Sequence, residues 1–136
     1  AICALTVTGT AIAESPAECL KRLKSPVACY ASSTQAAMLL CPLETMVSRE
    51  SGSNCRRQAT QETTQHYQAA LRSLSKHRAA ADLLKDAHAY FLAALAGTIP
   101  VGGESEAQYD RRTRDLAFQL DAKLNRLELE IPPASR

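Results

Sequence analysis

Five cysteines are the residues of this 136-residue chain with the clearest capacity for chemistry. Cys3 lies in an uncharged N-terminal run, and Cys19, Cys29, Cys41 and Cys55 follow it. If Cys3 is removed with an export signal, four cysteines remain, and four in a small exported chain predict two disulfide bonds, because an oxidising compartment allows them and a small core gains stability from them. Three pairings exist, and we favour the nested one, Cys19 with Cys55 and Cys29 with Cys41. The sequence gaps between these four cysteines are too wide for the C-x-x-C motif of structural zinc sites.

Three histidines, His66, His77 and His88, follow one another at intervals of eleven residues. Eleven residues span about 16 Å along a helix, whereas the ligands of one zinc ion lie within about 2–2.2 Å of it. No H-E-x-x-H motif accompanies them, and the C-x-x-C-H motif of haem attachment is absent from the sequence. We therefore predict no metal and no cofactor. His77 and His88 are expected in a core or interface, with a pH-sensitive contact as the alternative.

The sequence shows no catalytic motif. No G-x-S-x-G sequence surrounds a serine, and Gly102-Gly103 lies between two predicted helices, where the chain needs only to turn. Glu104, Glu106 and Asp110 are typical of an acidic helix N-terminus, which the helix dipole favours. We therefore expect a protein that is not an enzyme.

The charge balance argues against nucleic acid as a partner. The chain has 16 Lys and Arg and 14 Asp and Glu, a net charge of +2. Its basic pairs, Lys21-Arg22, Arg56-Arg57 and Arg111-Arg112, have acidic residues nearby and no interleaved aromatics, which is typical of solvated surface. A protein is the partner that we expect instead.

Residues 1–13, AICALTVTGTAIA, resemble the end of a secretory signal peptide. The run is uncharged and closes with Ala11-Ile12-Ala13, the small-x-small pattern that signal peptidase needs. A membrane-spanning helix would need about 20 apolar residues. We therefore expect cleavage after Ala13, loss of Cys3, a periplasmic or secreted protein, and no stable membrane anchor after processing. A buried strand and a retained anchor are the alternatives.

The alternative to export is a different compartment, the mitochondrial intermembrane space. Nine residues separate Cys19 from Cys29, as in the twin CX9C helical hairpins of the mitochondrial intermembrane space. Thirteen residues separate Cys41 from Cys55, and Pro26 stands where the first of those helices would continue. We keep this compartment as the second expectation.

The elements that position these residues should all be helices. Hydrophobic residues make up 46% of the chain and aromatics only 4%, so Ala and Leu must form a core of helix packed on helix. Residues 14–136 are expected to form one domain around one core. Within it, residues 14–54 should form the Cys-rich part and residues 55–131 a helical hairpin.

Residues 14–54 should consist of short, broken helices. Ser15-Pro16-Ala17-Glu18 is a helix start with Ser as N-cap and Pro at the first helical position, and Ser25-Pro26 is a second start of this kind. Pro42 should end or kink a third helix that begins near Ser33. The segment Ser51-Gly52-Ser53-Asn54 should be a loop whose last residue caps the next helix.

Residues 55–131 should form an antiparallel hairpin of two long helices, covered by the short disulfide-bonded N-terminal helices. From Cys55 to Leu95 the chain has no Gly or Pro and a heptad stripe, with a bend or break expected near residues 73–76. Ser105 should cap the second helix, which Pro132-Pro133 ends. The stripes should form a core or an interface, and this seam includes Tyr67, Leu74, His77, Leu84, His88, Phe91 and Leu120.

About 40 residues of this second part resemble the LprI-type lysozyme inhibitor family. In that family, too, a cysteine begins a helix, a tyrosine with leucines follows, and a second helix is rich in Ala and aromatics. The matching residues are Cys55, Ala59, Tyr67, Ala70-Leu71, Leu74, Ala81 to Leu84, Ala87 and Tyr90-Phe91. The resemblance implies binding to lysozyme or another cell-wall hydrolase in the periplasm, by surface complementarity and without turnover.

These features predict an exported protein that acts by binding a protein, as an inhibitor of a cell-wall hydrolase or an immunity protein against a toxin. Disulfides would keep its surface ordered before binding, which lowers the entropy lost on association. Animal lysozymes are usually basic, so the charge of +2 favours another target. The chain could act as a monomer or a homodimer. The alternative function is a structural subunit or assembly factor of an envelope or organellar complex.

Overall fold

The computed structural model describes residues 14–132; the expected signal sequence, residues 1–13, and residues 133–136 lie outside the described residues. In the described part, all regular structure is α-helical, which confirms the predicted all-α class. The five helices are α2 (Pro16–Leu23), α3 (Pro26–Val47), α4 (Arg49–Ser73), α5 (Arg78–Ala96) and α6 (Glu106–Glu130). None of these helices is long and apolar enough to cross a membrane.

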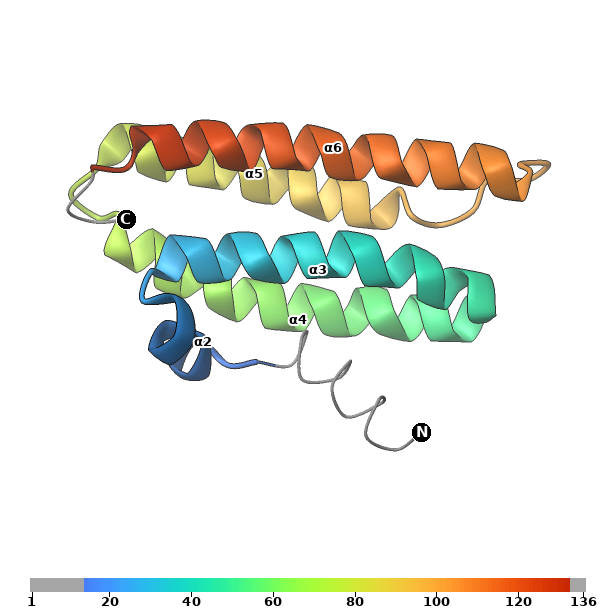
Figure 1. Cartoon of the computed structure of the whole chain (residues 1–136), viewed down its shortest axis with the longest axis horizontal. Coiled ribbons are helices and arrows are strands. Elements are labelled where there is room, and N and C mark those ends of the chain that lie inside the picture. Colours follow the sequence, from blue (N-terminus) through green and yellow to red (C-terminus); the bar gives the residue numbers. More distant parts are fainter. Residues whose placement is uncertain (1–13, 133–136) are drawn as a thin grey trace.

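The four longer helices lie along the long axis of the molecule, and the short α2 packs beside α3 and α4 (Figure 1). The chain passes back and forth along this axis from α3 to α6 (Figure 1). α3 packs mainly on α4, and α5 packs mainly on α6, while α3 also contacts α5 and α6. The sequence predicted that several short N-terminal helices cover a hairpin of two long ones. In the structure only α2 is short, α3 is one long helix, and α4 packs mainly on α3.

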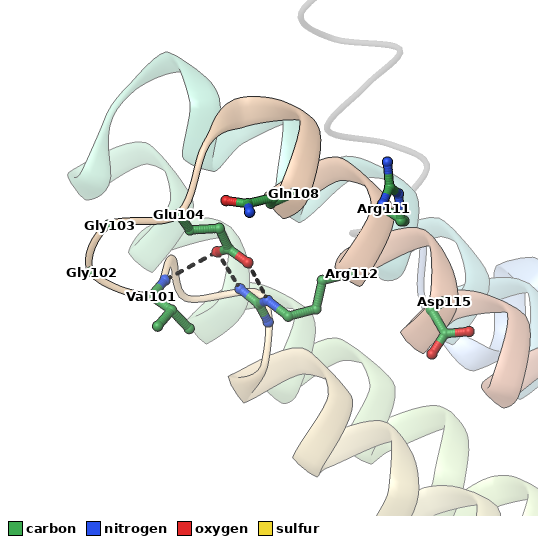
Figure 2. Close-up of a pocket in the computed structure, with 8 residues that line it drawn as sticks. All are labelled: Val101, Gly102, Gly103, Glu104, Gln108, Arg111, Arg112 and Asp115. Atoms are coloured by element: carbon green, nitrogen blue, oxygen red, sulfur yellow. Dashed lines mark hydrogen bonds and ion pairs between the residues drawn. The ribbon is translucent and has the colours of Figure 1, made fainter.

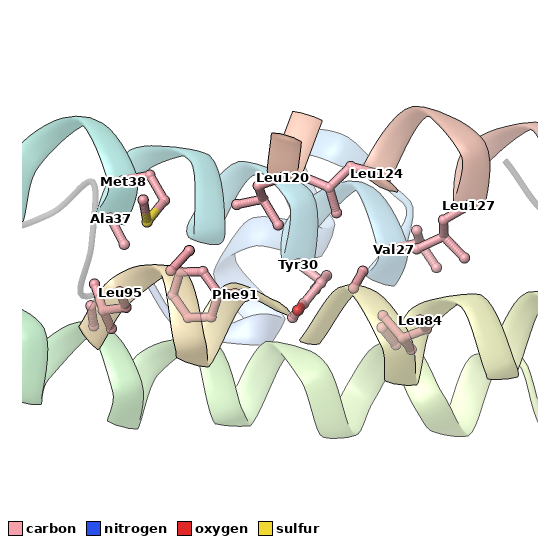
Figure 3. Close-up of a cluster of buried hydrophobic side chains, with 14 of the residues drawn as sticks. Val27, Tyr30, Ala37, Met38, Leu84, Phe91, Leu95, Leu120, Leu124 and Leu127 are labelled. Carbon is pink, nitrogen blue, oxygen red and sulfur yellow. The ribbon is translucent and has the colours of Figure 1, made fainter. Parts of the chain in front are cut away.

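The core lies between these helices and is built from aliphatic, aromatic and alanine side chains. Tyr30, Phe91 and Leu120, from three different helices, are fully buried and point toward the same interior (Figure 3). Burying a side chain of this size contributes about 1.5–3 kcal/mol. Alanines allow the helices to approach closely, and six of those within residues 14–132 are buried: Ala37, Ala59, Ala70, Ala80, Ala87 and Ala94.

Several predicted helix boundaries are confirmed. Ser15 and Ser25 cap α2 and α3, and each hydroxyl accepts a hydrogen bond from a backbone amide three residues later, at 3.2 Å. α4 ends at Ser73 and α5 begins at Arg78, where the bend was expected. Ser105 caps α6 with a reciprocal capping box to Gln108.

The predicted end of a helix at Pro42 is wrong. α3 is one helix of 22 residues with Pro42 inside it. A proline removes one helical hydrogen bond and clashes with the preceding turn. α3 nevertheless buries a long series of side chains, and tertiary packing supplies most of the stability of a helix in a folded protein. The local cost at Pro42 is therefore outweighed.

The predicted loop at residues 51–54 is also wrong, because these residues belong to α4. Ser48 is the N-cap of α4, and its hydroxyl accepts a hydrogen bond from the amide of Ser51 at 3.0 Å. Gly52 is buried, and a Cβ atom there would lie 2.8 Å from the Cα of Thr45 on α3. The glycine allows the two helices to approach closely where the chain turns from α3 into α4.

The nested disulfide pairing is wrong. Cys19 bonds to Cys29, which joins α2 to α3, and Cys41 bonds to Cys55, which joins α3 to α4. Because α3 is continuous, Cys29 and Cys41 lie about 18 Å apart along one helix, whereas disulfide-bonded Cα atoms lie within about 7 Å. The observed pairs have Cα–Cα distances of 5.9 and 5.4 Å. Two disulfides among the N-terminal helices are typical of a protein from a non-reducing compartment.

Candidate protein-binding site

The loop between α5 and α6, residues 97–105, lies at one end of the molecule (Figure 1) and presents apolar side chains to solvent. Ile99 is 53% exposed and Val101 is 59% exposed. Gly102 and Gly103 follow them, and no atom beyond the neighbouring residues approaches their Cβ positions within 4 Å. Gly103 has φ of +80°, a backbone conformation that glycine adopts without strain.

Arg112 on α6 holds this loop from one side (Figure 2). Its guanidinium donates to both carboxylate oxygens of Glu104, at 2.7 and 2.9 Å, and to the carbonyls of Gly97 and Ile99. Glu104 accepts a further hydrogen bond from the amide of Val101 at 3.2 Å. Hydrogen bonds between charged groups are stronger than neutral ones. The hydrogen bonds from Arg112 hold the pKa of Glu104 below its usual range.

Buried groups hold the loop from the side of the core. The hydroxyl of Tyr109 donates to the carbonyl of Thr98 at 2.6 Å, and the hydroxyl of Thr98 donates to the carbonyl of Leu95 at 2.7 Å. Thr98 is fully buried and Tyr109 nearly so. A loop fixed on both sides is ordered before a partner arrives, so little conformational entropy remains to be lost on binding.

The loop adjoins the corner where α3 meets α4. Arg56 on α4 donates from Nη1 to the hydroxyl of Thr45 on α3, at 3.0 Å, and to the hydroxyl of Thr98, at 3.5 Å. The hydroxyl of Thr45 donates to the carbonyl of Cys41 in α3, and that of Thr98 donates to the carbonyl of Leu95 in α5, so both accept from Arg56. Arg56 therefore connects the corner to the loop.

Exposed apolar side chains are concentrated near this end of the molecule. Of the nine large apolar side chains that are exposed among residues 14–132, six belong to the C-terminal half of α3 or to the loop. We call these six the apolar end: Leu39, Leu43, Met46, Val47, Ile99 and Val101. Concentrated apolar exposure marks surfaces that bind proteins.

The seam residues predicted from the sequence occupy different environments. Leu74, Leu84, Phe91 and Leu120 are at most 2% exposed and belong to the core. His77 is the N-cap residue of α5 and is half-buried, because the helix breaks just before it. Tyr67 and His88 are half-buried at the edge of the core, and here they meet a residue that the sequence did not point to.

That residue is Tyr30 on α3, whose hydroxyl lies 3.0 Å from Nδ1 of His88. The His88 ring stacks on Tyr67, with 3.9 Å between ring centroids and 9° between planes. Burial lowers the pKa of His88 and raises the pKa of Tyr30. His66 lies apart from them and contacts the carbonyl of Glu14 through Nε2 at 2.8 Å. In residues 14–132, no group of three or more His, Cys, Asp or Glu side chains could hold a metal ion.

Sequence reasoning also missed the contacts that fix the loop, and it treated Arg112 and Arg56 as solvated surface. Arg112 and Glu104 are eight residues apart, beyond the spacing of three or four at which helical side chains pair. The capping box at Ser105 was the available signal, since it fixes where the loop must end. Comparison with known proteins adds no name to this site: no family model, curated protein or solved structure matches the chain.

Proposed function

We propose that this protein is exported to the periplasm or secreted and acts, without turnover, as an inhibitor or immunity protein that binds a cell-wall hydrolase or a toxin. One observation carries this proposal: the α5–α6 loop exposes Ile99 and Val101 while Arg112 holds its backbone in place. An ordered apolar loop at the end of a narrow molecule suits insertion into a cleft. α5 and α6 would then act as a hairpin that presents the loop.

Three features of the chain support the proposed compartment and class of partner. The resemblance of residues 55–95 to the LprI-type family favours a hydrolase of the cell wall. The two disulfides suit a protein that works outside the reducing cytoplasm. The net charge of +2 favours a target that is not itself strongly basic.

Stoichiometric titration of purified hydrolases tests the proposal. The oxidised protein is added to a muramidase, an amidase and an endopeptidase, and the release of soluble fragments from peptidoglycan is followed. We expect one class to be inhibited with a one-to-one endpoint. Full activity of every class at a large molar excess of the protein would contradict inhibition of a cell-wall hydrolase.

Two variants locate the surface in the same assay. Val101→Asp places a charge on the loop and should weaken inhibition strongly. Leu129→Asp on α6 introduces the same charge at a position that is 76% exposed and lies outside the apolar end. The control variant should inhibit like the wild type. Equal inhibition by the two variants would show that the loop is not the binding surface.

A structural subunit or assembly factor is the second candidate, and Phe118 favours it. This aromatic side chain on α6 is 69% exposed, and it lies outside the apolar end. In this role the protein should form assemblies that the Phe118→Asp substitution disperses. Sedimentation velocity separates the candidates, because a free inhibitor remains a monomer or small oligomer whether or not Phe118 is replaced.

A further inference from the structure

A cavity lies between the α3–α4 corner and the α5–α6 loop, beside the apolar end. Its volume is about 420 Å³, and its walls are Thr45, Arg49, Arg56, Ile99 and Pro100. Two of these five residues are arginines. Arg49 is the first residue of α4, and Arg56 lies about two turns further along the same helix. The remaining walls supply hydroxyl and apolar groups. The cavity therefore combines positive charge with a partly apolar lining.

The two arginines have no acidic partner in the part of the chain that the structure describes. The four ion pairs among residues 14–132 involve Arg22, Arg112, Arg114 and Lys123. Arg56 is half-buried, and its two hydrogen bonds both run from Nη1 to neutral hydroxyls. A guanidinium has five N–H donors, so most donors of Arg56 are left for another acceptor.

The position of Arg56 is fixed before any ligand binds. Thr45 and Thr98 orient its Nη1 from two sides, and Gly52 keeps α4 close to Thr45. Arg49 is exposed and lies in the first turn of α4, where the helix dipole adds to the positive potential. An anion in the cavity would meet one oriented guanidinium, that of Arg56, and one exposed guanidinium, that of Arg49.

We propose that this cavity binds a carboxylate from the cleft of a cell-wall glycoside hydrolase. The inference rests on the proposed function, since the carboxylate belongs to the partner. Most glycoside hydrolases carry a pair of Asp or Glu residues beside the bond that they cleave. Arginine binds carboxylates through two parallel hydrogen bonds, which adds specificity as well as strength. Because Ile99 lines the cavity, insertion of the loop brings Arg56 to the acidic floor of the cleft.

A titration without any hydrolase tests the cavity by itself. The probe is N-acetyl-glutamate methylamide, whose only charge is one side-chain carboxylate, and N-acetyl-glutamine methylamide is its neutral counterpart. Amide resonances of the ¹⁵N-labelled protein should shift with the glutamate probe at Thr45, Arg49, Arg56 and Ile99, and not with the glutamine probe. Arg49→Gln and Arg56→Gln should each lower the affinity about tenfold. Shifts with inorganic phosphate and none with the glutamate probe would overturn the carboxylate assignment.

A second experiment measures inhibition of the muramidase, and Arg57→Gln is the matched control. Arg57 neighbours Arg56 in sequence, is exposed, and hydrogen-bonds Asn54 outside the cavity. We expect Arg56→Gln and Arg49→Gln to raise the inhibition constant about tenfold and Arg57→Gln to leave it unchanged. Arg49 is exposed, so its replacement should not disturb folding, and far-ultraviolet circular dichroism checks both variants.

The outcomes separate the two proposals. Inhibition that Arg49→Gln and Arg56→Gln leave intact would overturn the role of the cavity while the proposed function stands. Selective binding of the glutamate probe by a protein that inhibits no hydrolase would support a carboxylate-binding cavity and contradict its use against a glycoside hydrolase. A uniform loss in all three arginine variants would assign the effect to net charge and overturn the inference.

Discussion

The hydroxyl of Tyr30 on α3 lies 3.0 Å from Nδ1 of His88 on α5. This contact joins two helices through residues that are 58 positions apart in the sequence. Burial raises the pKa of Tyr30, so its hydroxyl stays protonated, and the direction of its hydrogen bond with Nδ1 follows the tautomer of His88. Burial also lowers the pKa of His88, because the charged ring would be poorly solvated.

Stability should therefore decrease in mild acid. The unfolded chain binds a proton at His88 more readily than the folded protein does, so the free energy of unfolding falls as pH drops below about 6.5 and levels off below the lowered pKa of the folded state. Urea unfolding between about pH 8 and pH 5 measures this dependence above the range where carboxylates titrate. His88→Gln should flatten the curve. An equal slope in wild type and His88→Gln would refute the assignment.

The disulfide connectivity makes a separate prediction. Peptide mapping of the unreduced protein should recover Cys19 linked to Cys29 and Cys41 linked to Cys55. Replacing Cys41 and Cys55 together with Ser should lower the free energy of unfolding by about 3 kcal/mol, since the bond closes a short loop of the unfolded chain. Denaturant unfolding measures the change. Recovery of a peptide that links Cys29 to Cys41 would contradict the continuous α3 helix.

Gly52 and Gly102 should respond differently to the same substitution, Gly→Ala. A Cβ atom at position 52 would meet Thr45, and overpacking of this kind costs about 1–3 kcal/mol. That cost exceeds the gain of about 0.5–1 kcal/mol that Ala gives over Gly inside a helix. Gly52→Ala should therefore lower the melting temperature. Gly102→Ala should leave it nearly unchanged, because no atom lies within 4 Å of that position. Stabilisation by Gly52→Ala would show that α3 and α4 are less close than described.

Arg112→Ala should loosen the α5–α6 loop without unfolding the bundle. The substitution removes the donors that hold Glu104 and the carbonyls of Gly97 and Ile99. Hydrogen exchange of residues 97–105 should become faster, as expected for local opening. Arg114→Ala is the control, because its ion pair with Asp110 lies on the exposed surface of α6. Similar exchange rates in the two variants would mean that other contacts hold the loop.

Two leucines of α6 distinguish core from surface. Leu120 is 0% exposed and Leu129 is 76% exposed. Leu120→Ala should lower the free energy of unfolding by about 2–5 kcal/mol, because it removes buried atoms and leaves a cavity. Leu129→Ala should change it by no more than about 0.5 kcal/mol. If Leu120→Ala has the free energy of unfolding of the wild type but no longer binds a partner, Leu120 belongs to an interface and the assignment to the core is wrong.

The sequence alone determined the elements whose signals are local. Ser15, Ser25 and Ser105 mark helix starts because an N-cap depends on residues only three positions apart. An unbroken helix from Cys55 to Leu95 would be about 60 Å long, which is long for so small a domain, and this length predicted a bend or break near residues 73–76. The low aromatic content and the abundance of Ala and Leu likewise predicted helix packed on helix.

Only the tertiary structure decided the features that depend on distant contacts. Pro42 stays inside α3, and Gly52 inside α4, because burial between helices outweighs a local cost of about 1–3 kcal/mol at each position. A continuous α3 then separates Cys29 from Cys41 and sets the disulfide pairing. The setting of Arg56 between Thr45 and Thr98 joins segments up to 42 residues apart. No periodicity within one helix encodes such a contact, since it arises only when the helices have packed.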